Sequence, residues 1–380
     1  MPSSPSPDGT QTTRGTPRPR GRLAGTSLRD ADFRRILLIK PSALGDVIHA
    51  LPVLDRLRAR FPEATIDWFI TPENAELVRH HPALSNVVMF DRKVLANFGR
   101  SVSATLGMFR LLWSLRRRRY DLVIDLHGQL RSALFCFATR SKTRIGFNRT
   151  REGAWLVYTH RVDMPTMEAH AVDRYLWISE LLGLEPAAPS FTIRVPPQAT
   201  ARVDALLKAA GADARPLAVI VPGTVWETKH WSAEGFAGVA RELLARGMQL
   251  VLAGAPQDRP RCRAVAAAAP GVYDLCGKTN LPELASLIDR SAVCVTNDSG
   301  SMHLAVAMDR PVVSVFGPTN PVRTGPYGRP EAVVQAGVEC APCYFKKLTQ
   351  CPHDHRCMHE VTPALVLARI DSLLATARAA

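Results

Sequence analysis

Short apolar runs alternate with longer amphipathic segments along most of the chain, and a polar loop follows most of the runs. In the first half the runs predict buried strands at 36–39, 65–70, 87–90, 122–126 and 144–147. In the second half they predict strands at 217–221, 249–253, 292–295 and 312–316. Strands that alternate with helices are typical of βαβ units, so each half is predicted to form a parallel sheet covered by helices.

A proline-bearing stretch at 185–198 separates the two series of strands. We therefore predict an N-terminal domain at 34–190 and a C-terminal domain at 199–360, with a cleft between them. At 380 residues the chain exceeds the usual size of a single hydrophobic core. Its apolar content of 46% is that of a globular protein.

The two ends of the chain differ from this pattern. Residues 1–30 are rich in Ser, Pro, Thr, Gly and Arg and have almost no periodic apolar positions, so we predict a disordered tail. A last helix is predicted at 362–380. Thr362 would be its N-cap, and Pro363 would lie in its first turn.

The net charge of +14 argues for anionic partners, which include nucleic acid, an anionic membrane surface and phosphorylated substrates. The charge alone does not choose among these classes. No apolar run is long enough to cross a bilayer, and Lys40 and Asp46 interrupt the apolar stretch at 36–39 too early for an export signal. Single cysteines in apolar segments also suit a reducing compartment. Together these features predict a cytoplasmic protein.

The segment 296–303 lies between a predicted strand and a helix predicted at 302–308. Ser299 and Gly300 would then lie at a helix N-terminus, where free amide groups and the helix dipole attract anions. Asp298 would face a ligand from the carboxyl end of the strand, the usual ligand crevice of an open α/β sheet. The alternative is that Asp298 and Ser299 only cap the helix.

Two further strand-to-helix turns carry groups suited to chemistry. Asp46 follows the first strand and could remove a proton from a hydroxyl nucleophile, or could merely cap its helix. Lys40, at the end of the same strand, could bind a phosphate, although an exposed lysine at a strand end is the commoner case. Thr224 and Lys229 in the second half suit a diphosphate leaving group, although a surface lysine in a loop is the alternative.

Four motifs fall in the order and spacing of a known family. They are Leu44-Gly45-Asp46-Val47, Pro222-Gly223 with Lys229-His230-Trp231, Asn297-Asp298-Ser299-Gly300 with His303, and Phe316-Gly317-Pro318-Thr319. In these motifs the chain resembles the bacterial lipopolysaccharide heptosyltransferases, glycosyltransferase family 9, over about 36–370. Four motifs in register are far more specific than any one of them.

This resemblance implies a GT-B fold, in which two Rossmann-like domains with parallel sheets face each other across a cleft, without a catalytic metal or any other cofactor. The C-terminal domain would bind a nucleotide sugar, typically ADP-heptose, and the N-terminal domain an acceptor in the inner core of lipopolysaccharide. Asp46 would be the general base for an in-line attack with inversion, and Lys229 would act at the diphosphate. The other donor-binding residues would be Gly223, Thr224, Asp298, Ser299, Gly300 and His303.

Basic residues of the first half are candidates for the anionic groups of the acceptor. A run at Arg140, Lys142, Arg144, Arg149 and Arg151 falls where the N-terminal domain of the family meets the acceptor. We take Lys40, His127, Arg131 and Arg144 as the candidate acceptor-binding residues. A solvated basic surface is the alternative interpretation.

An apolar helix with Phe109, Leu112 and Trp113 precedes the basic run 116–119. Such a helix could dock on an anionic membrane surface, which would make the protein peripheral at the inner membrane. We favour the other interpretation, a core-facing helix whose arginines complement its C-terminal dipole.

Four cysteines near the C-terminus have the spacing C-x2-C-x7-C-x5-C, at Cys340, Cys343, Cys351 and Cys357. Thiolates at such a spacing can hold a structural zinc ion. The spacing is not that of a standard zinc finger, however, and some heptosyltransferases have a similar cluster. We therefore rank a structural staple or ordinary thiols above zinc.

Two other functions fit part of the pattern. A nucleotide-sugar epimerase of the same architecture would also need a diphosphate site and a carboxylate. A nucleic-acid-binding protein fits only the charge, because aromatic residues are not interleaved with the basic runs and no docking motif is present. We therefore predict no nucleic-acid partner.

Overall fold

The computed structural model describes residues 23–24, 28–92, 96–148 and 150–379. Its first sheet has the strand order β1-β7-β6-β5-β2-β3-β4, in which all strands are parallel except β1, which pairs antiparallel with β7. These strands are β1 (Leu23–Ala24), β2 (Arg35–Ile39), β3 (Thr65–Ile70), β4 (Asn86–Met89), β5 (Leu122–Asp125), β6 (Thr143–Phe147) and β7 (His160–Val162).

The second sheet is parallel throughout and has the order β10-β9-β8-β11-β12-β13. Its strands are β8 (Leu217–Val221), β9 (Gln249–Leu252), β10 (Tyr273–Asp274), β11 (Val293–Asn297), β12 (Val312–Phe316) and β13 (Val333–Gln335). Counted along the chain, the parallel strands of both sheets follow the 3-2-1-4-5-6 order of Rossmann folds. The predicted pair of doubly wound α/β sheets is therefore confirmed.

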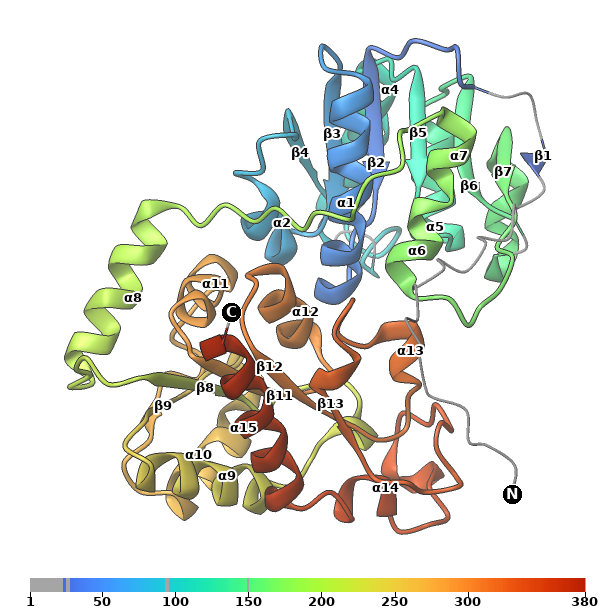
Figure 1. Ribbon diagram of the computed structural model, residues 1–380. Helices are drawn as coiled ribbons and strands as arrows, with labels where there is room; N and C mark the ends of the chain where they lie inside the picture. The colour runs from blue at the N-terminus through green and yellow to red at the C-terminus, as the bar shows by residue number, and fades with distance from the viewer. Residues whose placement is uncertain (1–22, 25–27, 93–95, 149, 380) are drawn as a thin grey trace, which may run out of the picture.

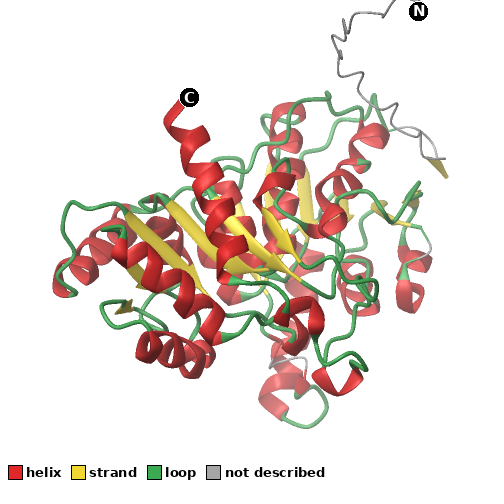
Figure 2. Ribbon diagram, turned by 60° about the horizontal axis from the view of Figure 1, so that its bottom comes forward, coloured by secondary structure: helices red, strands yellow, loops and turns green. Residues whose placement is uncertain are grey.

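Helices cover both faces of each sheet, as the red helices around the yellow strands show in Figure 2. In the first lobe they are α1 (Leu44–Arg60), α2 (Pro72–Val78), α4 (Val102–Arg117), α5 (Leu130–Ala138), α6 (Ala171–Leu176) and α7 (Ile178–Leu182), with the 3-10 segment η1 (Arg151–Val157). In the second lobe they are α8 (Pro197–Ala209), α9 (Ala233–Ala245), α10 (Arg259–Ala268), α11 (Leu281–Asp289), α12 (Gly300–Ala307), α13 (Pro321–Thr324), α14 (Arg356–His359) and α15 (Pro363–Ala379).

The central strands are apolar on both faces because helices bury both faces. In β2, Leu37 and Ile39 pack into the cluster under α4 and α5, whereas Ile36 and Leu38 pack into the cluster under α1. The cluster under α1 continues without a break into the other lobe, where it includes Met302 of α12. The two lobes are therefore joined by a shared apolar core.

The amino-terminal ends of α1 and α12 meet at the junction of the lobes (Figure 1). A Cβ atom at Gly45 would lie 2.4 Å from Cδ2 of His303, and a Cβ atom at Gly300 would lie 2.9 Å from the side chain of Leu44. No real Cβ atom tolerates the first distance, so α12 can approach Gly45 this closely only because the residue is glycine. The carboxyl end of β2 is thereby placed beside that of β11.

Several details differ from the prediction. Leu23 and Ala24, inside the predicted tail, form strand β1, while the tail residues 1–22 and 25–27 lie outside the described part of the chain. The strands β7, β10 and β13 were not predicted, because runs of two or three residues give little periodicity. Helix α12 starts at Gly300, before the predicted start at Met302.

The core-facing interpretation of the helix at 109–115 is wrong for its aromatic residues. In α4 only Ala104, Met108 and Leu115 are buried, whereas Phe109 is 57% exposed and Trp113 is 60% exposed. The sheet reaches only the opposite stripe of the helix. Across the described ranges, none of the helices is both long and apolar enough to pass through a bilayer.

Candidate active site

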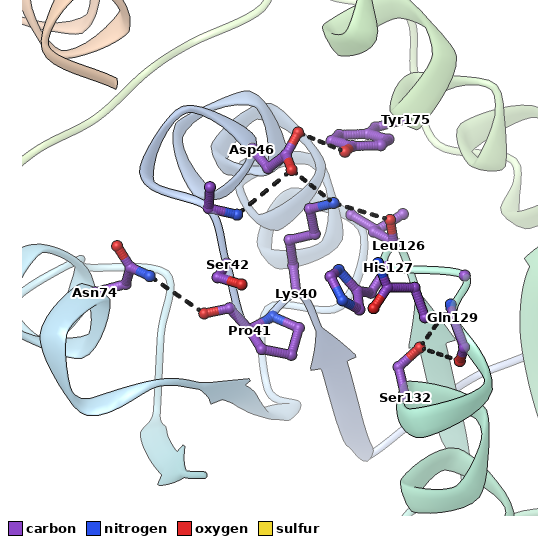
Figure 3. A network of polar contacts seen from close by, with 12 residues as sticks. Lys40, Pro41, Ser42, Asp46, Asn74, Leu126, His127, Gln129, Ser132 and Tyr175 are labelled. Carbon is purple, nitrogen blue, oxygen red and sulfur yellow. Dashed lines mark hydrogen bonds and ion pairs between the residues drawn. The ribbon is translucent and has the colours of Figure 1, made fainter. Parts of the chain in front are cut away.

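Asp46 lies in the first turn of α1, just after the carboxyl end of β2. Its Oδ1 accepts a hydrogen bond from the hydroxyl of Tyr175 at 3.2 Å, and its Oδ2 lies 3.4 Å from Nζ of Lys40. The side chain of Asp46 is 42% exposed, whereas that of Lys40 is only 4% exposed. Figure 3 shows Lys40 and Tyr175 reaching the carboxylate of Asp46 from two sides.

The pair of Asp46 and Lys40 is ionised. Burial, the largest influence, raises the pKa of Asp46, but the Lys40 ammonium and its hydrogen bond outweigh this effect, so the pKa lies below its usual value. Burial alone would lower the pKa of Lys40, but the negative charge of Asp46 and the contacts with Asp46 and Tyr175 raise it above its usual value. Burial and the negative charge of Asp46 raise the pKa of Tyr175 to about 12, so its hydroxyl stays protonated and donates.

The ammonium of Lys40 points to Asp46 and not outward to an acceptor. It also donates to the carbonyl oxygen of Leu126 at 3.4 Å, and it lies 5.0 Å from the ring centroid of Tyr175. Because these contacts enclose it, the geometry supports a positioning role for Lys40 in place of the predicted direct acceptor contact.

The second group of candidate residues gathers at the carboxyl ends of β8 and β11. Nζ of Lys229 lies 2.7 Å from Oδ2 of Asp298, and the side chains are 15% and 5% exposed. The hydroxyl of Thr224 donates to the carbonyl oxygen of Asp298 at 3.1 Å, and the hydroxyl of Thr319 donates to its carboxylate. Both strands flank the point where the strand order reverses, which is where open α/β sheets bind ligands.

Two cations share one aromatic ring beside this group. Nζ of Lys229 lies 4.5 Å from the ring centroid of Trp226, and Nζ of Lys346 lies 5.0 Å from it. Lys346 comes from the cysteine-bearing segment near the C-terminus, so the sequence motifs did not indicate it. The two ammonium groups give this part of the crevice a positive charge that suits a diphosphate.

Gly223 and Gly300 allow close approach of the backbone. A Cβ atom at Gly223 would lie 2.2 Å from the carboxylate of Asp258, so no other residue fits there without a shift. Ser299 caps α12 without a side-chain hydrogen bond to the helix, and its hydroxyl instead pairs with that of Thr296 at 3.0 Å. The first amide groups of α12 have no partner within the helix, as at every helix start, and are suited to a phosphate oxygen.

A histidine pair joins the two lobes between these groups. Nε2 of His49, on α1, lies 3.0 Å from Nδ1 of His303, on α12. Burial lowers the pKa of His303, and with the smaller effects of His170 and Lys229, opposed by Asp46, the pKa is about 3. His303 is thus within electrostatic range of both Asp46 and Lys229, which places the two groups near the same histidine.

A hollow of about 220 Å³ opens beside Asp46 at the carboxyl ends of β2 and β5. His127, Arg131 and Arg92 are among the residues that line it. Arg92 donates to the hydroxyl of Ser42, and burial together with Lys40 lowers the pKa of His127 to about 4. The hollow therefore has arginine charges and a neutral imidazole, which suit an anionic sugar.

Arg144 is not placed with this group. It lies in the amino-terminal half of β6, and its guanidinium donates to the carbonyl oxygens of Val157, at 2.7 Å, and Ser141. The sequence could not separate it from the others, because neighbours along the chain need not lie at one edge of a sheet. Arg149 and the side chain of Arg151 lie outside the described part of the structure.

Tyr175, Thr319 and Asp258 contact the candidate residues, and Lys346 shares the ring of Trp226 with Lys229, although the prediction did not include these four as site residues. Thr319 belongs to a motif that the sequence did indicate. Tyr175 comes from α6, far from Asp46 along the chain, and no sequence signal links the two residues.

The four cysteines near the C-terminus lie close enough to influence one another. Burial and, to a smaller extent, the neighbouring Cys343, Cys340 and Cys351 raise the pKa of Cys357 to about 11. All four are free thiols, so the predicted staple is not a disulfide. Among the described residues, the group whose ligand atoms all lie within 4.8 Å of one another is Cys262, Asp274 and Cys276, which does not include these four.

Comparison with known proteins gives one family. The model of Glycosyltransferase family 9 (heptosyltransferase) matches residues 108–353. Lipopolysaccharide heptosyltransferase 1 of Pseudomonas aeruginosa is 30% identical over 90% of this chain and 98% of its own length. Lipopolysaccharide heptosyltransferase 1 of Escherichia coli K12 is 29% identical over 80% of this chain and 93% of its own length.

Two solved structures have the same fold. E. coli heptosyltransferase WaaC with ADP-2-deoxy-2-fluoro heptose has a TM-score of 0.71 and 25% identity, over 89% of this chain and 99% of its own. E. coli ADP-heptose lps heptosyltransferase II has a TM-score of 0.72 and 24% identity, over 90% of this chain and 99% of its own. The predicted GT-B fold is confirmed.

Proposed function

The chain belongs to glycosyltransferase family 9, the heptosyltransferases, and we propose that it transfers heptose from ADP-heptose to the inner core of lipopolysaccharide. The observation that carries this proposal is that two charged groups flank His303 at the junction of the lobes. An ionised carboxylate, Asp46, lies on one side, and a cationic cradle around Lys229 lies on the other. The similar WaaC structure holds an ADP-heptose analogue, which supports the same donor here.

On the donor side, Lys229 and Thr224 would bind the diphosphate, together with the first amide groups of α12. Asp298 holds Lys229 in place at 2.7 Å while its own carboxylate accepts from Thr319. The bound diphosphate would therefore meet a cation that is already oriented. Such preorganisation lowers the cost of stabilising the charge that develops on the leaving group.

On the acceptor side, a sugar hydroxyl would lie against Asp46, and the anionic groups of the acceptor would lie toward Arg92, His127 and Arg131. The acceptor oxygen forms a bond to the anomeric carbon while the bond from that carbon to the diphosphate breaks. The hydroxyl proton passes to Asp46, and the electron pair of the broken bond leaves with ADP. Attack from the face opposite ADP inverts the anomeric configuration.

Lys40 and Tyr175 would fix the direction of the Asp46 carboxylate. The Lys40 ammonium keeps the carboxylate ionised, so it is ready to accept a proton at neutral pH. The same charge makes it a weaker base, so the proton transfer depends on the hydroxyl becoming acidic as its bond to carbon forms. None of these steps uses a metal or a cofactor.

We further propose that the protein works in the cytoplasm, as a peripheral protein at the inner membrane, where a lipid-linked acceptor would be presented. An epimerase would act on the donor alone, and the family assignment does not favour it. Nucleic acid is not proposed as a partner.

Product analysis with ADP-heptose tests the function directly. We expect ADP and a heptosylated product to form only when an inner-core acceptor is present, with inverted anomeric configuration. An epimerised donor in the absence of acceptor, or no reaction with any inner-core acceptor, would contradict the proposal.

A further inference from the structure

The outer face of the first lobe carries an exposed apolar stripe on α4. Val102, Leu106, Phe109 and Trp113 are 79%, 49%, 57% and 60% exposed. Their spacing of four, three and four residues places them on one side of the helix, opposite the stripe that packs on the sheet. The ring of Phe109 lies 6.1 Å from that of Phe98, between centroids, and Phe98 is itself 46% exposed.

The neighbouring helix α5 continues the same surface. Leu130, Leu134 and Phe137 are 48%, 55% and 59% exposed, again at helical spacing. Both helices cover the same face of the sheet and pack against each other. We call the exposed residues of these two stripes the apolar face: Val102, Leu106, Phe109, Trp113, Leu130, Leu134 and Phe137.

Basic residues surround one end of the apolar face. A hollow of about 750 Å³ at the carboxyl ends of α4 and α5 is lined by Trp113 and by Arg116, Arg117, Arg119, Arg140 and Lys142. The guanidinium of Arg117 lies 4.8 Å from the ring centroid of Trp113, and that of Arg144 lies 5.9 Å from the ring centroid of Phe137. The acidic residues of the hollow are Asp32 and Asp121, and Asp121 is already bound to the backbone amides of Arg34 and Arg35.

The opposite end of the apolar face reaches the candidate acceptor hollow. Leu130 begins α5, and the next residue, Arg131, lines that hollow. The apolar face therefore extends from a cationic hollow to the site where an acceptor sugar would be bound. Monomeric proteins rarely expose contiguous apolar surface of this kind without a partner.

We propose that the apolar face docks on an anionic lipid bilayer. Aromatic and aliphatic side chains would enter the interface, while the surrounding arginines would bind lipid phosphates, the combination by which amphipathic helices bind membranes. The net charge of +14 favours such a surface over an acidic or neutral one. The inference deepens the proposed function and rests on it, because docking in this orientation brings a lipid-anchored sugar to the crevice at Asp46.

Vesicle binding tests the surface separately from catalysis. Wild-type protein should sediment with vesicles of phosphatidylcholine and phosphatidylglycerol, and much less with phosphatidylcholine alone or at high salt. Trp113→Glu and Phe109→Glu should each weaken binding at least tenfold. The matched control is Leu365→Glu on α15, because Leu365 is also exposed, at 49%, but lies outside the apolar face. This variant should bind like the wild type.

The charge contribution has its own matched pair. Arg116→Glu with Arg117→Glu should abolish binding to the anionic vesicles, whereas Arg202→Glu with Lys208→Glu on α8 changes the net charge equally and should retain it. All four side chains are exposed, so the fold should be unaffected, and thermal unfolding checks this. Equal binding by both double variants would overturn the proposal.

Two acceptors separate this inference from the proposed function. Trp113→Glu should lose transfer to an acceptor embedded in vesicles but keep wild-type transfer to a delipidated, water-soluble acceptor. Absence of transfer to the soluble acceptor by the wild type would reject the proposed function, whatever the vesicles show. If the wild type ignores vesicles but forms a dimer by light scattering that Trp113→Glu dissociates, the apolar face binds a second copy and the lipid proposal is overturned.

Discussion

At the scale of single residues, the contacts around Asp46 keep its carboxylate negatively charged. Lys40 keeps the carboxylate ionised, and the hydroxyl of Tyr175 donates to Oδ1 at 3.2 Å. A residue that only capped α1 would need neither contact, since its partner would be a backbone amide of the first turn. The backbone contact that Asp46 does make, with the amide of Ala43, is long, at 3.4 Å.

Asp46→Asn should therefore remove proton acceptance with little change in shape. We expect kcat to fall by about 10²- to 10⁴-fold, the usual contribution of a positioned general base. The affinity for ADP should stay within about twofold, because the substitution lies on the acceptor side. Initial rates and calorimetry measure the two quantities.

Asp55→Asn is the matched control for this change. Asp55 is on the same helix, 26% exposed, and faces His81 outside the crevice. It should leave kcat unchanged. Retained turnover by Asp46→Asn would remove Asp46 from the proposed role of base.

Lys229 is the corresponding residue on the donor side. Lys229→Ala should weaken ADP binding by about 1.5–3 kcal/mol, the usual value of a hydrogen bond to a charged group. It also leaves the buried carboxylate of Asp298 without its cation. Calorimetric titration with ADP measures the loss.

Lys347→Ala provides the comparison. Lys347 is exposed and follows Lys346 directly, but among the described residues it is Lys346, and not Lys347, that contacts Trp226. Its affinity for ADP should equal that of the wild type. If Lys229→Ala also binds ADP as tightly as the wild type, the proposed diphosphate cradle is wrong.

At the scale of elements, the site depends on how closely α1 and α12 approach. Gly45→Ala would force a Cβ atom to 2.4 Å from the ring of His303, so one of the helices must move. Overpacking of this kind typically costs about 1–3 kcal/mol. We expect a lower Tm and a large loss of transfer, because Asp46 is the next residue along the chain.

Gly337→Ala serves as the control, since a Cβ atom there would meet no atom within 4 Å. It should change neither Tm nor transfer. A Gly45→Ala variant as stable and active as the wild type would show that the crevice does not require the close contact of the two helices.

The strands and the turns that follow them could be predicted from the sequence, whereas contacts between distant elements could not. β3 and β12 were predicted with their observed bounds, because long apolar runs between polar loops leave few alternatives. The turns carrying Asp46 and Asp298 were predicted to lie near ligands, because they follow such strands. Tertiary packing decides that Lys40 points to Asp46, that Tyr175 contacts Asp46 and that Arg144 lies apart from the other basic candidates. The periodicity of the sequence carries no information on such packing.

At the scale of the whole molecule, the two Rossmann-like sheets meet at a junction where α1 packs on α12, and a shared apolar core holds them there. The buried His49–His303 contact crosses this junction at 3.0 Å. Both imidazoles have pKa values held low by burial. His49 and His303 are therefore neutral in the folded protein at neutral pH, and we expect the free energy of unfolding to depend on pH.

The direction of this dependence follows from proton uptake. Burial lowers the pKa of His303 to about 3, and burial lowers those of His81, His127 and His230 to about 4. An unfolded histidine titrates near 6.5. Between these values the unfolded chain binds more protons, so the free energy of unfolding should fall as the pH drops from about 6.5 toward 4. Asp55, Asp125 and Asp258, whose pKa values are raised by burial, act in the opposite sense at the acidic end of this window.

His303→Asn isolates one of these protons. It should reduce the slope of unfolding free energy against pH, between about 6.5 and 4.5, by up to about 1.4 kcal/mol per pH unit, the contribution of a single proton. Denaturant titrations at a series of pH values measure the slope independently of the overall loss of stability. His80→Asn, at an exposed position on the same protein, should leave the slope unchanged. Equal slopes for the two variants would mean that His303 is already protonated in the folded state, and then a charged imidazolium, not a neutral one, would lie between Asp46 and Lys229.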